Sequence, residues 1–197
     1  MGYSNHELTA LIGSRICHDL ISPIGAIGNG LELMQMNRTG SDPELALISE
    51  SLENANARIR FFRIAFGLAS EGQSAAAIEV RRVLADLSRG SRLRYLWQSD
   101  DDCPRYELRA VFLALLCLET ALPYGGEVRI SSGAGWRIEG HGPRLRLQEN
   151  LWQNLTGQTA TSVSPAEVQF ALLPLLVAEM ERELSVEIAD DRISLAF

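Results

Sequence analysis

The chain has 197 residues, of which 46% are hydrophobic and 22% are charged, a composition typical of a globular protein with one large or two small domains. The formal net charge of −7 argues against a nucleic-acid partner, and the absence of lysine excludes a Schiff-base or P-loop lysine. No apolar run has the roughly 18 residues of a membrane span, and residues 1–10 lack signal-peptide features, so we expect a cytoplasmic protein without membrane contact.

Two long helices are predicted for the first third of the chain. Apolar residues recur at steps of three and four from Leu8 to Met34, which defines one face of a helix. This pattern stops at a turn that contains Gly40. The next helix is expected to have Pro43 at its first position, with Asp42 as its cap or Ser41 in a capping box.

The second helix carries a heptad pattern, with apolar residues at alternating steps of three and four from Leu45 to Phe66. This period favours antiparallel pairing of the two helices at a shallow crossing angle. Two helices bury too little apolar surface for a stable domain, so we expect a second hairpin, from another copy of the chain, to complete a four-helix bundle in a homodimer. The alternative is that the rest of the chain covers the apolar seam.

Residues 74–197 mix helical and strand patterns. The strongly apolar segment 106–122 predicts a helix that ends at Pro123, and the capping box that starts at Ser164 predicts a helix to about residue 183, kinked at Pro174. The other expected elements are a helix over 79–89, a strand over 93–98, and hairpins formed by 126–132 with 135–139 and by 186–188 with 193–195. Residues 144–147 alternate again, and His141, between two glycines, is expected in a loop.

This order of elements predicts an α+β fold in which helices cover one face of an antiparallel or mixed sheet. We expect two domains, a helical hairpin over residues 1–73 and an α/β domain over 74–197. Cysteines and histidines number three each, and no CxxC pair occurs, so the sequence predicts no metal site and no disulfide framework.

His18 is the most informative residue, because it lies off the apolar face of the first helix in the segment His-Asp-Leu-Ile-Ser-Pro-Ile (18–24). Residues three, four, seven or eleven positions away project to the same side. Most of them are small, so another protein can approach the imidazole closely. These candidate partner-binding residues are Ser14, Arg15, Ile21, Gly25 and Asn29.

An imidazole suits phosphoryl transfer, because with an ordinary pKa of about 6.5 it is largely neutral at pH 7. One ring nitrogen can attack phosphorus while an acceptor holds the other N–H. Asp19 is the candidate acceptor if the His18 ring leans toward it, Ser22 can hydrogen-bond a phosphoryl oxygen or a water, and Arg15 can offset the phosphoryl charge. The competing interpretation is a solvated surface histidine.

The segment 18–24 resembles the H-box of bacterial sensor histidine kinases, in which an acid follows the phosphoacceptor and a polar residue and a proline come one turn later. The longer string 16–32 resembles the alphaproteobacterial ChpT-type histidine phosphotransferase family. This resemblance implies a dimerising helical hairpin followed by a degenerate kinase-like α/β domain. It also implies that His18 is the phosphoacceptor, Asp19 its hydrogen-bonding acid and Ser22 the polar residue one turn on.

Compared with the kinase pattern, the α/β domain lacks the residues that a nucleotide site needs. No asparagine for Mg²⁺ occurs over 117–120, Ile138 stands in place of the adenine-reading aspartate, and Val168 and Phe170 replace glycines that would approach phosphates. The resemblance therefore implies no ATP binding and no cofactor, with Mg²⁺ supplied by the acidic pocket of a partner receiver domain.

The leading hypothesis is a phosphorelay protein that accepts a phosphoryl group from one receiver domain, such as that of a hybrid histidine kinase, and passes it to the receiver of a response regulator. The alternatives are a divergent ATP-dependent histidine kinase core, a non-catalytic module that binds receivers or kinases, and a protein that dephosphorylates receivers through a water held by Ser22.

Overall fold

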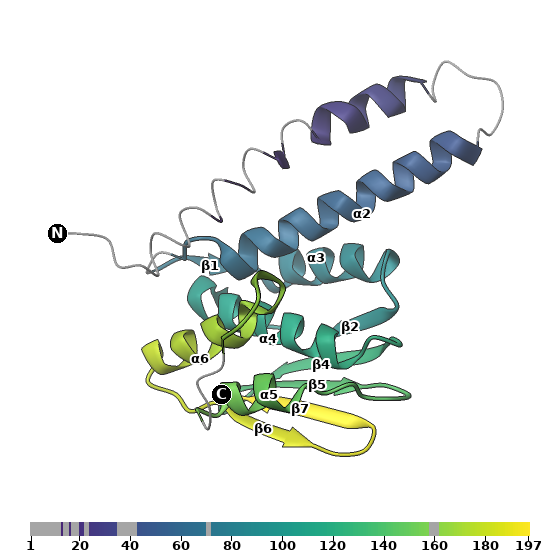
Figure 1. The fold of residues 1–197 in the computed structure, drawn as a ribbon. Coiled ribbons are helices and arrows are strands. Elements are labelled where there is room, and N and C mark those ends of the chain that lie inside the picture. The colour runs from purple at the N-terminus through teal and green to yellow at the C-terminus, as the bar shows by residue number, and fades with distance from the viewer. Residues whose placement is uncertain are drawn as a thin grey trace.

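The structure, a computed structural model, describes residues 13, 16, 20, 21, 24–34, 43–69, 72–157 and 162–197. Residues 24–34 form a helix that lies beside the longer helix α2 (Pro43–Phe66). Together they make a hairpin that projects to one side of the remaining chain (Figure 1). The first residue of α2 is Pro43, as predicted.

Two close contacts show the antiparallel direction of the hairpin helices. A Cβ atom on Gly28 would lie 3.1 Å from Leu52 Cδ2, and one on Gly13 would lie 2.9 Å from the carbonyl oxygen of Phe66. Residues early in one helix therefore lie against residues late in the other. Glycine permits this close approach because it has no side chain, and the pairing agrees with the predicted antiparallel hairpin.

The described residues from 74 onward, called the α/β domain below, form short helices and a sheet. The elements are β1 (Ser74–Ala75), α3 (Ala77–Arg89), β2 (Leu93–Trp97), β3 (Cys103–Pro104), α4 (Arg105–Ala121), β4 (Gly126–Ser132), β5 (Trp136–His141), α5 (Glu149–Leu155), the 3₁₀ helix η1 (Pro165–Glu167), α6 (Gln169–Glu179), β6 (Ser185–Ile188) and β7 (Arg192–Ala196). Within the described ranges, no helix is long and apolar enough to cross a membrane.

The main sheet has the strand order β2-β4-β5-β7-β6. Strand β2 runs parallel to β4, with Tyr95 opposite Val128, and the other neighbours are antiparallel. A second ladder pairs β1 with β3. The α+β class and the mixed sheet are therefore as predicted.

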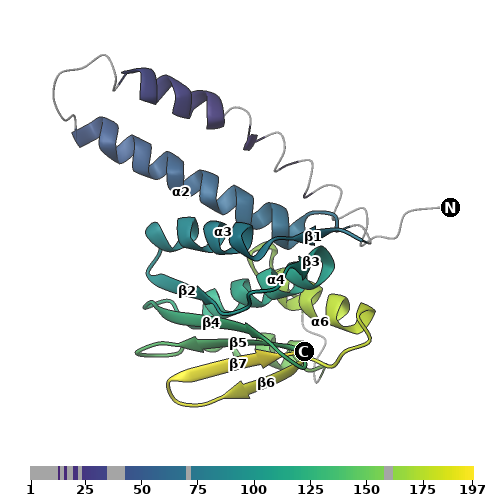
Figure 2. The ribbon, with the colours of Figure 1, turned by 180° about the vertical axis from the view of Figure 1, so that it is seen from behind.

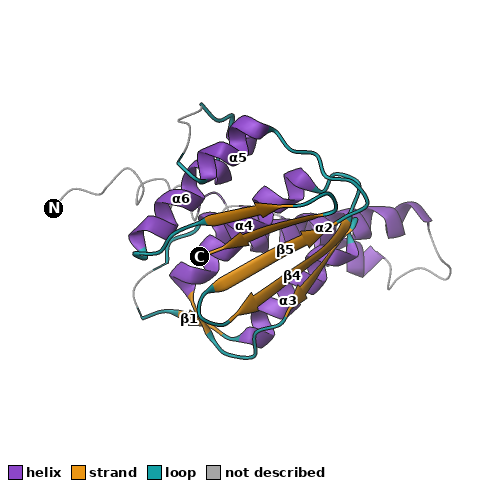
Figure 3. Cartoon of the chain, turned by 90° about the horizontal axis from the view of Figure 1, so that it is seen from below, coloured by secondary structure: helices purple, strands orange, loops and turns teal. Residues whose placement is uncertain are grey.

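The molecule is layered, with the hairpin over the helices and the sheet beyond them (Figures 1 and 2). Seen from below, one face of the sheet carries the helices and the other is open (Figure 3). Helix α4 is the centre of the core, because the run 108–118 is buried on every side of the helix. Its Leu115 and Leu118 pack in one cluster with Ile130 and Ile138 of the sheet.

The C-terminal half of α2 belongs to the same core. Phe61 and Ala65 have no exposed surface, and the Phe61 ring lies 4.7 Å from that of Phe112 in α4. The buried Arg109 of α4 donates from Nε to the carbonyl oxygen of Ala65 at 3.3 Å. Helix α2 thus has two buried faces, one toward the first helix and one toward the α/β domain, and the heptad pattern predicted only the first.

The predicted helix over 164–183 is divided and shorter. The capping box is present, since the Ser164 main-chain N–H donates to Glu167 Oε2 at 3.1 Å, and the Ser164 hydroxyl also donates to that atom at 2.8 Å. It caps η1, however, and α6 ends at Glu179, followed by Glu181 with a φ of 55°. Residues 144–147 join no ladder, and α5 was not predicted.

Candidate functional site

Most of the predicted site residues lie outside the described part of the chain, and their roles stay predictions. These residues are His18, Asp19, Ser22, Ser14 and Arg15. The described members of the predicted partner surface are Ile21, Gly25 and Asn29.

The three described members form a row along the first helix, because each is four residues from the next. All three have helical backbone; Ile21 and Gly25 are half-buried, and Asn29 is exposed. A Cβ atom on Gly25 would meet no described heavy atom within 4 Å. This part of the helix therefore offers open space beside a small residue, as the predicted partner surface requires.

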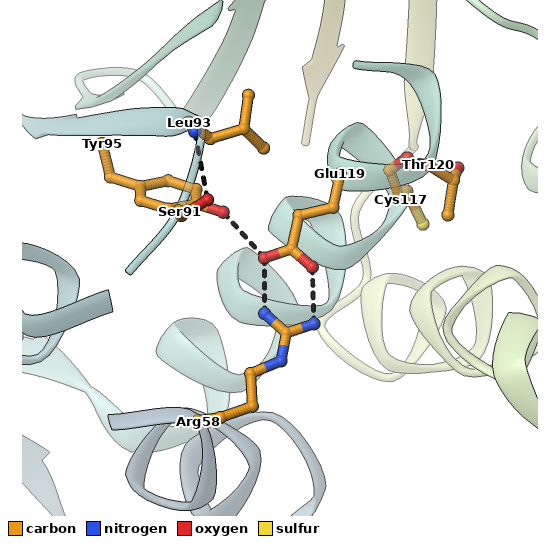
Figure 4. Close-up of polar contacts among 7 residues, drawn as sticks. All are labelled: Arg58, Ser91, Leu93, Tyr95, Cys117, Glu119 and Thr120. Atoms are coloured by element: carbon orange, nitrogen blue, oxygen red, sulfur yellow. Dashed lines mark hydrogen bonds and ion pairs between the residues drawn. The ribbon is translucent and has the colours of Figure 1, made fainter. Parts of the chain in front are cut away.

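A bidentate ion pair between the hairpin and the α/β domain joins Arg58 of α2 to Glu119 of α4 (Figure 4). The two guanidinium nitrogens donate to the two carboxylate oxygens at 2.7 and 2.6 Å. The hydroxyl of Tyr95, from β2, donates to Oε1 of the same carboxylate at 2.7 Å. Two-fold, charge-assisted contacts of this kind fix direction as well as distance.

The surroundings of this cluster favour the charged guanidinium and the neutral phenol. Burial on its own lowers the pKa of Arg58, but the hydrogen bonds and the charge of Glu119 outweigh it, so that the pKa is raised. Burial, together with the charge of Glu119 and the hydrogen bond to it, raises the pKa of Tyr95. The Arg58 guanidinium also lies 4.8 Å from the centre of the Phe62 ring, a cation–π distance.

The residues that the sequence comparison with kinases singled out are buried in the core. Ile138 has no exposed surface, and neither has Cys117, whose thiol pKa is raised well above its usual value by burial. Phe170 is also fully buried and packs edge-to-face on Trp152 at 5.3 Å. In the part of the chain that the structure describes, no three His, Cys, Asp or Glu side chains gather in a possible metal site.

The glycines around His141 serve packing. His141 is the last residue of β5, opposite Arg192 of β7, so the expectation of a loop is wrong. A Cβ atom on Gly140 would lie 2.9 Å from Leu122 Cδ1, and one on Gly142 would lie 2.5 Å from Leu122 Cδ2. Both glycines let the end of this strand approach the end of α4 closely.

Sequence reasoning missed Arg58, Tyr95 and Glu119. The arginine lies 61 positions before the glutamate and the tyrosine 24 positions before it, so no local period connects them. The one signal in the sequence that could have pointed to this cluster was Glu119, an acidic residue within the segment 117–120 where the kinase pattern has its metal-binding asparagine.

Residues 78–192 match the family model for the histidine phosphotransferase C-terminal domain. The protein phosphotransferase ChpT of Brucella abortus (strain 2308) is 38% identical over 136 residues, which are 68% of this chain and 62% of that protein, so less than two thirds of the relative's length is matched. A solved bacterial phosphotransferase has 31% identity and a TM-score of 0.70, over 100% of this chain and 98% of its own.

Proposed function

The chain belongs to the histidine phosphotransferase family, and we propose that it relays a phosphoryl group between the aspartates of two receiver domains through a phosphohistidine at His18. The observation that carries the proposal is the pattern His-Asp-x-x-Ser-Pro at 18–23 in a chain whose residues 78–192 match that family. The receivers are those of a hybrid histidine kinase and of a response regulator.

The reaction is an in-line displacement at phosphorus. One ring nitrogen of His18 attacks the phosphorus of an aspartyl phosphate, the new P–N bond forms, and the P–O bond to the receiver's carboxylate breaks. Asp19 accepts the hydrogen bond of the other ring nitrogen, and Ser22 donates to a phosphoryl oxygen. The second receiver takes the group by the reverse chemistry. Because the transition state is loose, positioning and charge neutralisation provide most of the catalysis.

The receiver docks on the face of the first helix that carries Ser14, Arg15, Ile21, Gly25 and Asn29. The open space at Gly25 and the exposed side chain of Asn29 support this role. Small side chains beside a phosphoacceptor let the phosphoaspartate approach within reacting distance, which is about 3–3.5 Å.

The protein has no autokinase activity of its own in this proposal. The buried Ile138 and Phe170 support it, because the kinase pattern has an aspartate and a glycine in their places. No asparagine for Mg²⁺ occurs over 117–120. Mg²⁺ then acts in the acidic pocket of the receiver, and the α/β domain provides a second docking surface.

A homodimer built on a four-helix bundle is the expected assembly, with residues 1–73 as the dimerising and transferring domain. Large apolar side chains of the hairpin are exposed in the single chain, which supports an apolar partner surface. They are Ile16, Leu20, Ile27, Leu33, Met34, Leu47 and Ile48. A second hairpin would cover a substantial part of this surface.

Transfer is tested by mixing the purified protein with receiver domains that carry a radiolabelled aspartyl phosphate. Acid-labile label should appear on the wild type and not on a His18→Gln variant. Label that appears from ATP alone would instead favour a histidine kinase. Rapid release of inorganic phosphate without labelled protein would favour dephosphorylation, and binding of receivers without either reaction would favour an interaction module.

The dimer is tested separately by sedimentation. The wild type should sediment as a dimer, and an Ile16→Glu, Ile27→Glu double variant should shift toward the monomer, because charged groups in an apolar seam are costly. A monomeric wild type at micromolar concentration would contradict the bundle.

A further inference from the structure

Helix α2 leaves the core of the α/β domain at the level of Arg58. Farther along the helix, Phe61 and Ala65 are fully buried, and the Ala65 carbonyl accepts from Arg109. In the other direction the helix continues to Pro43 and projects from the domain (Figure 1). Contacts at this level, together with that of Asn54 with Gly90 at the end of α3, therefore set the direction in which the hairpin projects.

The Arg58–Glu119 pair lies between two open spaces. A hollow of about 470 Å³ on one side and another of about 680 Å³ on the other both have these two residues in their walls. Apolar packing is thus interrupted on either side of the pair. A second ion pair, between Arg60 and Asp86, joins α2 to α3. It makes one contact at 3.2 Å, and the Arg60 side chain is 47% exposed, so this pair constrains the direction of α2 less than the Arg58–Glu119 pair does.

The pair itself is sheltered and geometrically complete. Arg58 is 36% exposed and Glu119 19%, and the two carboxylate oxygens receive three donors from two other elements. Removal of one partner would leave the others half-buried without their charge or hydrogen bond, which is costly. The cluster is the only described contact in which the hairpin, the central helix and the edge strand β2 share one carboxylate.

We infer that Arg58, Glu119 and Tyr95 are positioning residues for phosphotransfer, which hold the hairpin at one angle to the α/β domain so that a receiver in contact with both is seated in one pose. This inference rests on the proposed function. The anchor at Phe61 and Ala65 acts as the pivot, and the bidentate pair prevents tilting about it.

A small tilt of the hairpin relative to the α/β domain would change how a receiver that contacts both is seated. At a rise of about 1.5 Å per residue, Leu45 lies roughly 20 Å along α2 from Arg58. A tilt of about 5° at the pair would move that part of the hairpin by roughly 2 Å. The contacts of Gly13 with Phe66 and of Gly28 with Leu52 place Ile21 and Gly25 beside α2 near the level of Arg58, where the displacement is much smaller. At Ile21 and Gly25 the tilt changes the angle of the docking face relative to the α/β domain more than its position, so a receiver in contact with both would be seated in a different orientation.

The transfer assay compares Arg58→Gln with a matched control, Arg182→Gln. Arg182 makes a similarly sheltered two-fold contact with Glu107, at 3.1 and 3.4 Å, but within the α/β domain. At saturating phosphorylated receiver, Arg58→Gln should lower the maximal transfer rate about tenfold or more. Arg182→Gln, with a comparable loss of melting temperature, should leave that rate within about twofold. Labelling of His18 by phosphoramidate, a small donor that needs no docking, should be unchanged in both variants.

A charge exchange and a distance measurement complete the test. The double variant Arg58→Glu, Glu119→Arg should regain most of the rate. Spin labels at the exposed positions 46 and 188 should show a broader distance distribution in Arg58→Gln than in Arg182→Gln. The labels are introduced as cysteines in a Cys17→Ser background, with labelled chains diluted among unlabelled ones.

The outcomes separate this inference from the proposed function. If the wild type takes label from no receiver, the proposed function fails. If the wild type transfers but Arg58→Gln transfers equally fast, or slows only as much as Arg182→Gln with an unchanged distance distribution, the positioning role is overturned.

Discussion

Replacement of Phe61 by alanine tests whether the hairpin and the α/β domain share one core. The Phe61 ring has no exposed surface and lies 4.7 Å from Phe112 and 6.2 Å from Phe62. Loss of a fully buried phenylalanine costs about 3–5 kcal/mol, because apolar contacts are lost and a cavity remains. For a chain of this length that corresponds to a fall in melting temperature of roughly 10 °C.

The assay is thermal and urea unfolding, followed by circular dichroism at one fixed protein concentration, since assembly affects apparent stability. The matched control is Glu53→Ala, on the same helix but exposed, which should change stability by less than about 0.5 kcal/mol. Helix and sheet signals should be lost together in Phe61→Ala. A loss below about 1 kcal/mol, or separate transitions for the two parts, would refute the shared core.

Alkaline pH should destabilise the protein, because burial raises the pKa of Tyr95 and, with the charge of Glu107, raises the pKa of Cys103 to about 12. The unfolded chain releases these protons at its ordinary values of 10 and 9, so the free energy of unfolding falls as pH rises above about 9. Urea titrations should show a shallower fall above pH 10 in Tyr95→Phe; parallel curves for the two proteins would contradict the role of the phenol. A Gly28→Val variant should lose about 1–3 kcal/mol, because its side chain has no room against the facing helix. Gly30→Val, at an open helical position, should lose less, and equal losses would show that the contact does not limit the packing.

Short-range patterns were enough to predict most of the elements. The start of α2 at Pro43, the apolar helix over 106–122 and the strands 126–132 and 193–195 follow from turn residues and apolar periods. The predicted helix over 164–183 was too long. The capping box at Ser164, a pattern that usually begins an α-helix, here begins the short 3₁₀ helix η1, and α6 ends at Glu179. Local signals indicate where an element begins more reliably than how far it extends.

Tertiary contacts account for what could not be predicted. Phe61 and Ala65 lie on a second face of α2 that becomes apolar only because α4 covers it. Arg58 and Glu119 are ordinary surface residues by sequence and become partners only when the hairpin lies on the domain. Glycines near His141 were interpreted as a loop, whereas the strand needs them to pass close to Leu122.

The candidate site divides in the same way. Chemistry of the segment 18–24 predicted the phosphoacceptor and its neighbours from residue types, and the family comparisons agree with that function. The loss of a nucleotide site was predicted from absent residues, because Ile138 stands where the kinase pattern has an aspartate and Phe170 where it has a glycine. Only the three-dimensional structure reveals that these side chains belong to the core. It also reveals that Glu119, within the segment 117–120 where the kinase pattern has its asparagine, binds Arg58 of the hairpin.

The most direct test of the relay uses three purified proteins and one label. A phosphorylated donor receiver is mixed with an acceptor receiver, and this chain is added last. Label should move through this chain to the acceptor, with a transient on His18, and should stay on the donor when His18→Gln is added instead. Equal transfer to the acceptor with His18→Gln, or without any added chain, would contradict the account.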